Sequence, residues 1–242
     1  RDMARRPNMR RGEGDAAQRP QPGGDRNQHV TVEASARRGL SLRENTLHRE
    51  LPPIDLDRLA DRIDEWKSSN TLAYQQTDKI KPQFVVEKLC ELTKGEAIIT
   101  TEVGQHQMWA AQYLGFEDPN RWMTSGGLGT MGYGLPASLG VQIAHPDALV
   151  INVAGEASWL MNMQELGTAA QYRLPVKQFI LNNERLGMVR QWQELLHGER
   201  YSHSWSEALP DFVKLAEAFG AKGIICKDPA DLDDAIMEMI NH

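Results

Sequence analysis

Two short segments carry residue types that can hold an anion and a metal ion together. Gly155-Glu156-Ala157-Ser158 lies between a predicted strand and a predicted helix, where free backbone N–H groups and the positive end of the helix favour an anion such as diphosphate. Asn183 follows after a stretch long enough for one helix and one strand. The carboxylate of Glu156 and the amide oxygen of Asn183 are hard ligands of the kind that Mg²⁺ selects. The pair therefore predicts half of a magnesium diphosphate site at the ends of two neighbouring strands.

Strand and helix patterns alternate around these two segments. Short apolar runs between turn signals predict the strands 97–101, 148–153, 176–181 and 223–226. Apolar residues at helical spacing predict the helices 54–66, 82–92, 159–172, 210–219 and 228–240. The alternation predicts an α/β fold, a parallel sheet with helices on both faces. Such sheets bind ligands beyond the carboxyl ends of their strands, which is where both segments fall.

The beginning of the chain differs in composition from the rest. Residues 1–50 are rich in Arg, Gly, Gln and Pro and poor in large apolar side chains, so they cannot bury enough surface to offset chain entropy. We expect a disordered tail over 1–50, a short helix and a linker over 51–80, and one folded domain over 81–242. An arginine-rich arm for RNA or an import receptor is the alternative, but acidic residues are mixed in and no aromatic residue is interleaved.

The composition of the whole chain narrows the classes of partner and compartment. A net charge of -6 argues against nucleic acid as a partner, because phosphate backbones are bound by clustered cations. Cys90 and Cys226 are the only cysteines and lie far apart in the sequence, which indicates a reducing compartment and excludes a cysteine-based zinc site. Because the sequence lacks a run of about eighteen apolar residues, neither a membrane span nor export is expected, and the cytoplasm is the default location.

Longer motifs flank the two segments. Gly155-Glu156-Ala157-Ser158 followed by Asn182-Asn183 is similar to the signature of thiamine-diphosphate enzymes, which begins Gly-Asp-Gly/Ala and ends in paired asparagines. Segments 103–109, 125–136 and 186–192 resemble those of acetolactate synthase (acetohydroxyacid synthase) large subunits in particular. The likeness runs from about Lys81 to the end. It implies that 81–242 is the thiamine-diphosphate-binding domain, truncated at its C-terminus, and that 51–80 is a remnant of the preceding central domain.

The resemblance implies thiamine diphosphate and Mg²⁺ as cofactors. Met131 would lie beneath the thiamine and hold it bent, which brings the aminopyrimidine nitrogen close to the reactive thiazolium carbon. Magnesium would be bound by Glu156, Asn183 and the backbone carbonyl of Arg185. The full set of implied cofactor-binding residues is Gln105, His106, Gly129, Met131, Gly155, Glu156, Ala157, Ser158, Asn183, Gly187 and Met188.

Two further points concern the substrate and the metal. Met188 and Trp192 would face the substrate channel, and Trp192 would favour the larger of two competing ketoacid acceptors. The family motif usually has Asp where this chain has Glu156, so the extra methylene pushes the carboxylate farther toward the metal. Magnesium tolerates little distortion of its ligands, so binding requires a slight shift of the loop.

The implied activity is condensation of pyruvate with a second 2-ketoacid, pyruvate or 2-ketobutyrate, with loss of CO₂, in valine, leucine and isoleucine synthesis. In that family the activating glutamate comes from the N-terminal domain of a neighbouring subunit, and FAD binds mainly to the central domain. Because this sequence contains neither domain, no catalytic residue is expected here and the chain alone is expected to be inactive. Expected partners are the full-length subunit, as a homodimer or larger assembly, and a small regulatory subunit; a eukaryotic source would imply a plastid or mitochondrion.

Several other interpretations compete with this one. Gly127 to Gly132 satisfies the dinucleotide pattern G-x-G-x-x-G, but no predicted strand precedes it and no acid follows at the usual spacing. His106 could cap a helix, Met131 and Met188 could fill a core, and Trp192 could pack in an amphipathic helix. Another thiamine-diphosphate-dependent decarboxylase or oxidase shares the metal motif, and a non-catalytic truncated product is the remaining alternative.

Overall fold

The computed structural model describes residues 55–69 and 72–242, which fall in two units, the first ending at Ser69 and the second beginning at Asn70. In the first unit, α2 (Leu56–Ser68) begins after Asp55, whose side chain accepts a hydrogen bond from the backbone nitrogen of Arg58 at 3.0 Å. The predicted helix over 54–66 is confirmed from Leu56 onward. The tail expected over 1–50 lies outside the described residues. No described helix is long and apolar enough to cross a membrane.

The second unit is built on a parallel sheet. Its strands are β1 (Ile98–Thr101), β2 (Trp122–Thr124), β3 (Val150–Gly155) and β4 (Lys177–Leu181), in the order β2-β1-β3-β4. Every neighbouring pair is parallel. The predicted strands over 97–101, 148–153 and 176–181 are therefore confirmed, and β2 is a strand that the sequence patterns did not reveal.

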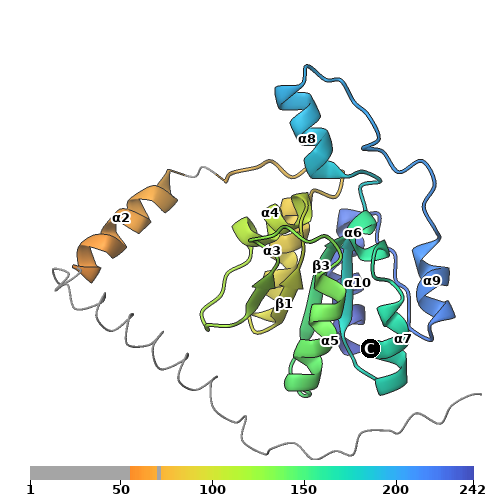
Figure 1. Ribbon diagram of the computed structural model, residues 1–242. Helices are drawn as coiled ribbons and strands as arrows, with labels where there is room; N and C mark the ends of the chain where they lie inside the picture. The colour runs from red at the N-terminus through yellow and green to blue at the C-terminus, as the bar shows by residue number, and fades with distance from the viewer. Residues whose placement is uncertain (1–54, 70–71) are drawn as a thin grey trace, which may run out of the picture. The chain divides into compact units, whose positions relative to one another are not determined.

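Helices cover both faces of the sheet, as the alternation of elements predicted (Figure 1). On one face α3 (Pro82–Thr93), α4 (Gln105–Tyr113) and α10 (Leu232–Asn241) pack over Ile99, Ile151 and Val153. On the other face α5 (Gly134–Ala144), α6 (Glu156–Leu160), α7 (Glu165–Tyr172) and α9 (Phe212–Ala218) pack over residues such as Ala154. Odd and even strand residues thus enter separate cores, because successive side chains point to opposite faces.

A row of polar side chains crosses the sheet beneath α5. Thr100, Asn152 and Gln178 occupy matching positions on β1, β3 and β4. The Asn152 amide donates to Gln178 Oε1 at 2.8 Å, and Thr100 Oγ1 donates to the carbonyl of Gly134 at 3.0 Å. A Cβ on Gly134 would lie 2.0 Å from Glu102 Oε2 and 2.2 Å from Asn152 Oδ1. Only glycine therefore allows α5 to begin this close to the strand ends.

Two sequence predictions need correction. Gly223–Cys226 was predicted as a strand, but it is not one in the structure, because a strand requires a ladder partner and no described strand pairs with this segment. Gly223 packs instead against α9, where an added Cβ would lie 2.6 Å from Val213 Cα. The helix predicted over 159–172 is divided into α6 and α7 by a turn. The last helix is preceded by the 3-10 turn Pro229–Asp231.

The segment before α3 belongs to the second unit and packs on its helices through aromatic residues. Tyr74 packs edge-on against Tyr113, with ring centroids 5.8 Å apart, and the Tyr113 hydroxyl donates to the carbonyl of Leu72 at 2.9 Å. The Tyr74 hydroxyl donates to the carboxylate of Glu87 on α3. Burial together with that hydrogen bond raises the pKa of Tyr74 to about 12. Part of the polar stretch before Lys81 is therefore tied to α3 and α4.

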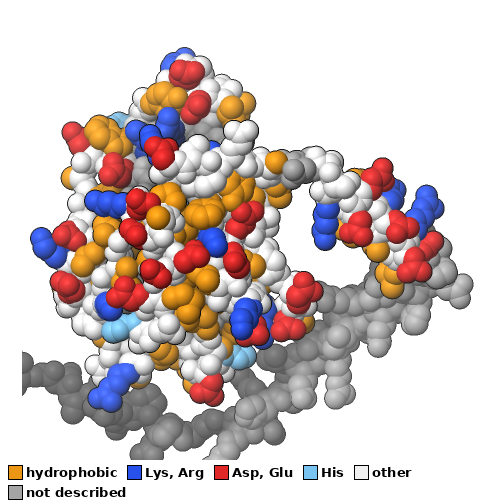
Figure 2. Space-filling view, turned by 180° about the vertical axis from the view of Figure 1, so that it is seen from behind, with side chains coloured by type: hydrophobic (Ala, Val, Ile, Leu, Met, Phe, Trp, Pro, Cys, Tyr) orange, Lys and Arg blue, Asp and Glu red, His pale blue; other side chains and the backbone are white. Residues whose placement is uncertain are grey.

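Charges of both signs are mixed on the surface. Lys88 lies between Glu91 and Asp233 at 3.1 and 3.2 Å, and Lys222 pairs with Glu238 at 2.5 Å. Figure 2 shows Lys and Arg side chains interspersed with Asp and Glu on the face seen from behind. Such exposed pairs contribute little to stability, about 0–1 kcal/mol each. The charged surface therefore contributes much less to holding the fold than the two apolar cores do.

Candidate functional site

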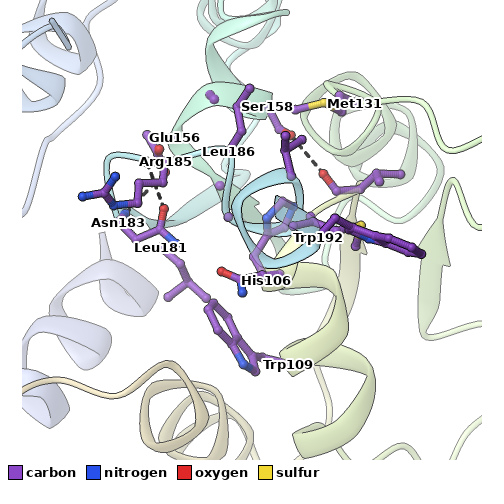
Figure 3. A pocket seen from close by; sticks show the side chains of 18 residues that line it. His106, Trp109, Met131, Glu156, Ser158, Leu181, Asn183, Arg185, Leu186 and Trp192 are labelled. Atoms are coloured by element: carbon purple, nitrogen blue, oxygen red, sulfur yellow. Dashed lines mark hydrogen bonds between the residues drawn. The ribbon is translucent and has the colours of Figure 1, made fainter. Parts of the chain in front are cut away.

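A pocket of about 340 Å³ opens at the carboxyl ends of β1, β3 and β4. Almost every site residue predicted from the sequence lines it: Gln105, His106, Met131, Gly155, Glu156, Ala157, Ser158, Asn183, Arg185, Gly187, Met188 and Trp192. In the view of Figure 3, Glu156, Asn183 and Arg185 lie on one side and Met131 and Trp192 on the other. Gly129 is the one predicted residue outside the lining. The pocket lies where parallel sheets bind ligands, at the strand ends.

Glu156 is buried at the first position of α6, directly after β3. Its Oε2 accepts a hydrogen bond from the backbone nitrogen of Asn183 at 3.4 Å, whereas its Oε1 is buried without a partner. Burial raises the pKa of Glu156, although backbone N–H groups of Glu156, Asn183 and Arg185 and the charge of His106 act in the opposite direction. A buried carboxylate oxygen without a donor is suited to a cation.

Asn183 follows β4, and β4 pairs with β3 up to Gly155 and Leu181. This register brings the residues after the two strands to the same edge of the sheet. The Asn183 side-chain oxygen accepts a hydrogen bond from the backbone nitrogen of Arg185 at 3.1 Å. The turn includes Glu184 at a φ of 58°, a conformation uncommon for a residue with a side chain. The loop thus has a defined shape that keeps Asn183 beside Glu156.

His106 is buried at the start of α4, against two glycines. An added Cβ would lie 2.6 Å from His106 Nδ1 at Gly104 and 2.8 Å from the same atom at Gly155. The imidazole therefore fills the space between the β1 loop and the β3 loop. Ser158 also joins these loops, because its hydroxyl donates to the carbonyl of Val103 at 3.3 Å.

Gln105 and Gly187 meet beside Asn183 in the pocket lining. The Gln105 amide donates to Gln191 Oε1 at 3.0 Å, which links α4 to α8 (Gly187–Leu196). A Cβ on Gly187 would lie 2.2 Å from Gln105 Oε1. Close approach of these two segments therefore depends on the absence of a side chain at position 187.

The turn that carries Met131 is held at both ends. The hydroxyl of Ser125 accepts a hydrogen bond from the backbone nitrogen of Thr130 at 2.9 Å, and the Asn162 amide donates to the carbonyl of Gly132 at 2.6 Å. Gly129 and Gly132 have φ values of 71° and 75°, which favour glycine. Gly129 thus shapes the turn from outside the pocket, and Met131 faces into it.

Helix α8 forms the outer wall of the pocket with an apolar stripe that is only partly covered. Met188, Val189 and Trp192 line the pocket, yet 57% of Trp192 is exposed. No residue of α8 is buried. Among the described residues Trp192 is therefore not packed into a core, and it lies at the pocket lining on α8.

Sequence reasoning missed six of the lining residues. They lie at or just after strand ends, on α4, or at the start of α8: Val103, Gly104, Trp109, Leu181, Leu186 and Val189. It also missed Glu102, which is fully buried at the end of β1. The location of Glu102 directly after a predicted strand could have indicated a place at the pocket, because ligands bind beyond the carboxyl ends of parallel strands.

Comparison with known proteins identifies the family. The family model named thiamine pyrophosphate enzyme, C-terminal TPP binding domain, matches residues 102–242 of the sequence, which is more than half of the chain. This chain belongs to the thiamine pyrophosphate enzymes. The rival assignment as a dinucleotide-binding domain is therefore wrong, and the predicted family is confirmed.

Within that family the chain is similar to acetolactate synthases. It is 46% identical over 217 residues to the acetolactate synthase isozyme 3 large subunit of Escherichia coli, covering 88% of this chain and 38% of the relative. It is 52% identical over 173 residues to the acetolactate synthase large subunit of Buchnera aphidicola, covering 71% and 30%. It is 49% identical over 186 residues to the mitochondrial acetolactate synthase catalytic subunit of Saccharomyces cerevisiae, covering 74% and 27%. The chain thus spans about a third of the length of these relatives.

Proposed function

We propose that this chain binds thiamine diphosphate through a magnesium ion held by Glu156, Asn183 and the backbone carbonyl of Arg185. One observation carries the proposal: Glu156 Oε1 is buried without a partner, while Oε2 of the same carboxylate lies 3.4 Å from the backbone nitrogen of Asn183. A divalent cation at Oε1 would satisfy the buried oxygen, and oxygen ligands from two loops leave other coordination positions for phosphate and water. The donor set therefore fits the metal.

The rest of the pocket fits the organic part of the cofactor. Gln105, His106 and the glycines at 155 and 187 provide polar groups and close backbone approach for the diphosphate, while Met131 lies across the pocket for the thiamine. When bound, thiamine diphosphate supplies a carbon nucleophile for breaking and forming bonds at carbonyl carbons. The side chains of this chain bind it, orient it and exclude water.

The activity that we propose for the complete protein is that of an acetolactate synthase, a transferase. The relatives carry that name, and the match to them covers most of this chain. The substrates would be pyruvate and a second 2-ketoacid, pyruvate or 2-ketobutyrate, with loss of CO₂, in branched-chain amino acid synthesis. Met188 and Trp192, which line the exposed end of the pocket, would contact these substrates.

We propose the following organisation for the complete enzyme. Residues 51–80 would belong to the end of a central domain that binds FAD, and 81–242 would be the thiamine-diphosphate domain. The glutamate that activates the aminopyrimidine would come from an N-terminal domain of a neighbouring subunit in a homodimer or larger assembly, with a small regulatory subunit as a further partner. The chain alone would then bind the cofactor without turnover, and acetolactate formation by the purified chain would contradict this. A cytoplasmic location remains a prediction.

Calorimetric titration with thiamine diphosphate, with and without Mg²⁺, tests the proposed site. Binding to the intact chain is expected only with Mg²⁺ and is expected to be lost in Glu156→Ala. Glu117→Ala, which removes an exposed carboxylate away from the pocket, is the matched control and should bind like the wild type. Binding that is independent of Mg²⁺, or equal in Glu156→Ala, would remove the basis of the assignment.

A second experiment, product analysis of a complemented complex, distinguishes an acetolactate synthase from other thiamine-diphosphate enzymes. Complementation of this chain with the upstream domains of an acetolactate synthase should give acetolactate from pyruvate. Acetaldehyde or acetate as the main product would indicate a decarboxylase or an oxidase. A complemented complex that binds the cofactor but forms no product would indicate a non-catalytic chain.

A further inference from the structure

The carboxylate of Glu102 connects two parts of the pocket wall. Glu102 follows β1 and is fully buried. Its Oε2 accepts a hydrogen bond from the backbone nitrogen of Gly134 at 2.8 Å, at the start of α5. Its Oε1 lies 3.4 Å from Nε2 of His106. One side chain therefore contacts both the predicted diphosphate ligand His106 and the element that follows Met131.

Glu102 and His106 depend on each other for a hydrogen-bond partner. Oε1 of Glu102 and Nε2 of His106 are both buried, and neither has a hydrogen bond to any other described residue. Leaving both buried atoms unpaired would destabilise the folded state, because each has lost its hydrogen bonds to water. A hydrogen on Nε2 shared with Oε1 satisfies both groups after a small adjustment of the 3.4 Å separation.

The opposite edge of the imidazole is directed toward the anion-binding loop. Nδ1 is the atom that an added Cβ on Gly155 would approach most closely, and Gly155 is the residue before Glu156. Since Nε2 faces Glu102, the ring cannot turn over without moving Nε2 to the Gly155 side. Gly104 and Gly155 pack against the ring and fix its plane, and the contact with the Glu102 carboxylate determines which ring nitrogen faces the pocket.

We propose that Glu102 is a positioning residue: it accepts a hydrogen from His106 Nε2 and so presents the Nδ1 edge of the ring to the diphosphate. This rests on the proposed function, because the orientation of His106 matters through its contact with the cofactor. Through Oε2, the same carboxylate fixes the backbone of Gly134 at the positive end of α5. Glu102 thus couples the diphosphate end of the pocket to the end near Met131.

The position of the imidazole hydrogen tests the proposal without any cofactor. In wild type, ¹⁵N NMR of the ring should show hydrogen on Nε2 of His106. In Glu102→Gln the amide oxygen must still accept from Gly134, so the NH₂ group faces Nε2 and the hydrogen is expected to move to Nδ1. Glu102→Asp keeps an acceptor, and the hydrogen is expected to stay on Nε2. The same hydrogen position in wild type and Glu102→Gln would overturn the proposal.

A double-mutant cycle then tests whether Glu102 acts through His106. Glu102→Gln is expected to weaken binding of Mg²⁺ and thiamine diphosphate about 10- to 100-fold, as loss of an orienting partner does at metal sites. In the His106→Asn background the same change should cost less than about twofold. Equal losses in both backgrounds would show that Glu102 acts only through Gly134 and the fold, which contradicts the proposal. Glu96→Gln, at an exposed position, is the control.

The two proposals fail in different ways. If wild type does not bind Mg²⁺ and thiamine diphosphate, the proposed function fails, while the ¹⁵N spectra still decide the relation between Glu102 and His106. If wild type binds but the hydrogen does not move in Glu102→Gln, only the positioning role fails. Chemical denaturation of each variant measures its free energy of unfolding, which distinguishes a variant that fails to fold from one in which only the orientation of His106 has changed.

Discussion

Oε2 of Glu156 lies 3.4 Å from the backbone nitrogen of Asn183, across the ends of β3 and β4. This contact joins two segments that are separated in sequence by α6, α7 and β4. Because it uses only one carboxylate oxygen, it leaves Oε1 buried and unpaired. The consequences can be measured in stability as well as in binding.

The first prediction concerns the pH dependence of stability without cofactor. Burial raises the pKa of Glu156, so the folded chain holds a proton more tightly than the unfolded chain. The stability that this proton contributes is present below the ordinary pKa of 4.5 and is lost as pH rises through the raised pKa of the folded state. Glu156→Gln cannot ionise, so it should be more stable than wild type at neutral pH. Urea denaturation at several pH values, with chelator, measures the difference; a difference that does not grow with pH would contradict it.

The second prediction concerns the space beside His106. Gly155→Ala would bring a Cβ to 2.8 Å from Nδ1 and should destabilise the domain by about 1–3 kcal/mol, because the ring is packed on both sides. Gly140→Ala on α5 is the matched control, since an added Cβ there meets nothing within 4 Å. That control should stabilise the helix by about 0.5–1 kcal/mol. Denaturation curves of both variants check the pair, and similar values for the two would refute the packing explanation.

The third prediction compares two tryptophans. Trp192→Ala should change the free energy of unfolding by less than about 0.5 kcal/mol, because the indole is 57% exposed. Trp159→Ala should cost about 3–5 kcal/mol, because only 3% of that side chain is exposed. In a complemented complex, Trp192→Ala should alter the preference between pyruvate and 2-ketobutyrate as acceptor. Competition experiments measure that ratio; an unchanged ratio would place Trp192 outside the substrate channel.

The last prediction concerns the segment before α3. Tyr74→Phe should lose about 1 kcal/mol through the missing hydrogen bond to Glu87. In wild type the stability from the neutral phenol is present below pH 10.0 and is lost as pH rises through about 12. The difference in phenolate absorbance between wild type and Tyr74→Phe should therefore show a titration near pH 12. A titration near pH 10 would show that the segment does not pack on α3.

The sequence predicted the fold best where a pattern was local. Apolar runs such as Val150 to Val153 identify a buried strand because both faces of a parallel strand are covered. β2 was missed because it is very short and only partly buried at the sheet edge. The error at Gly223 had the opposite cause, since a strand-like composition does not supply a pairing partner.

The candidate site was predicted through motif resemblance, and the structure adds what a motif does not contain. Glu156 and Asn183 were paired from their positions after two strands, and the β3–β4 register explains why they meet. The sequence did not indicate a role for Glu102, because an acidic residue at the end of a strand can serve many purposes. Its partners are Gly134, 32 residues further along the chain, and His106, one helical turn away. Trp109 on α4 and Leu186 just before α8 line the pocket because of how these elements are placed in space, which periodicity does not specify.

The hydrogen bond from the Arg185 backbone to the Asn183 amide oxygen has one more effect. An sp² oxygen has two lone pairs, and Arg185 occupies only one of them. The loop can therefore keep its folded geometry while the second lone pair receives an incoming cation. In the proposed magnesium site, an ion would then meet a side chain that is already oriented, which would lower the free-energy cost of arranging the loop on binding.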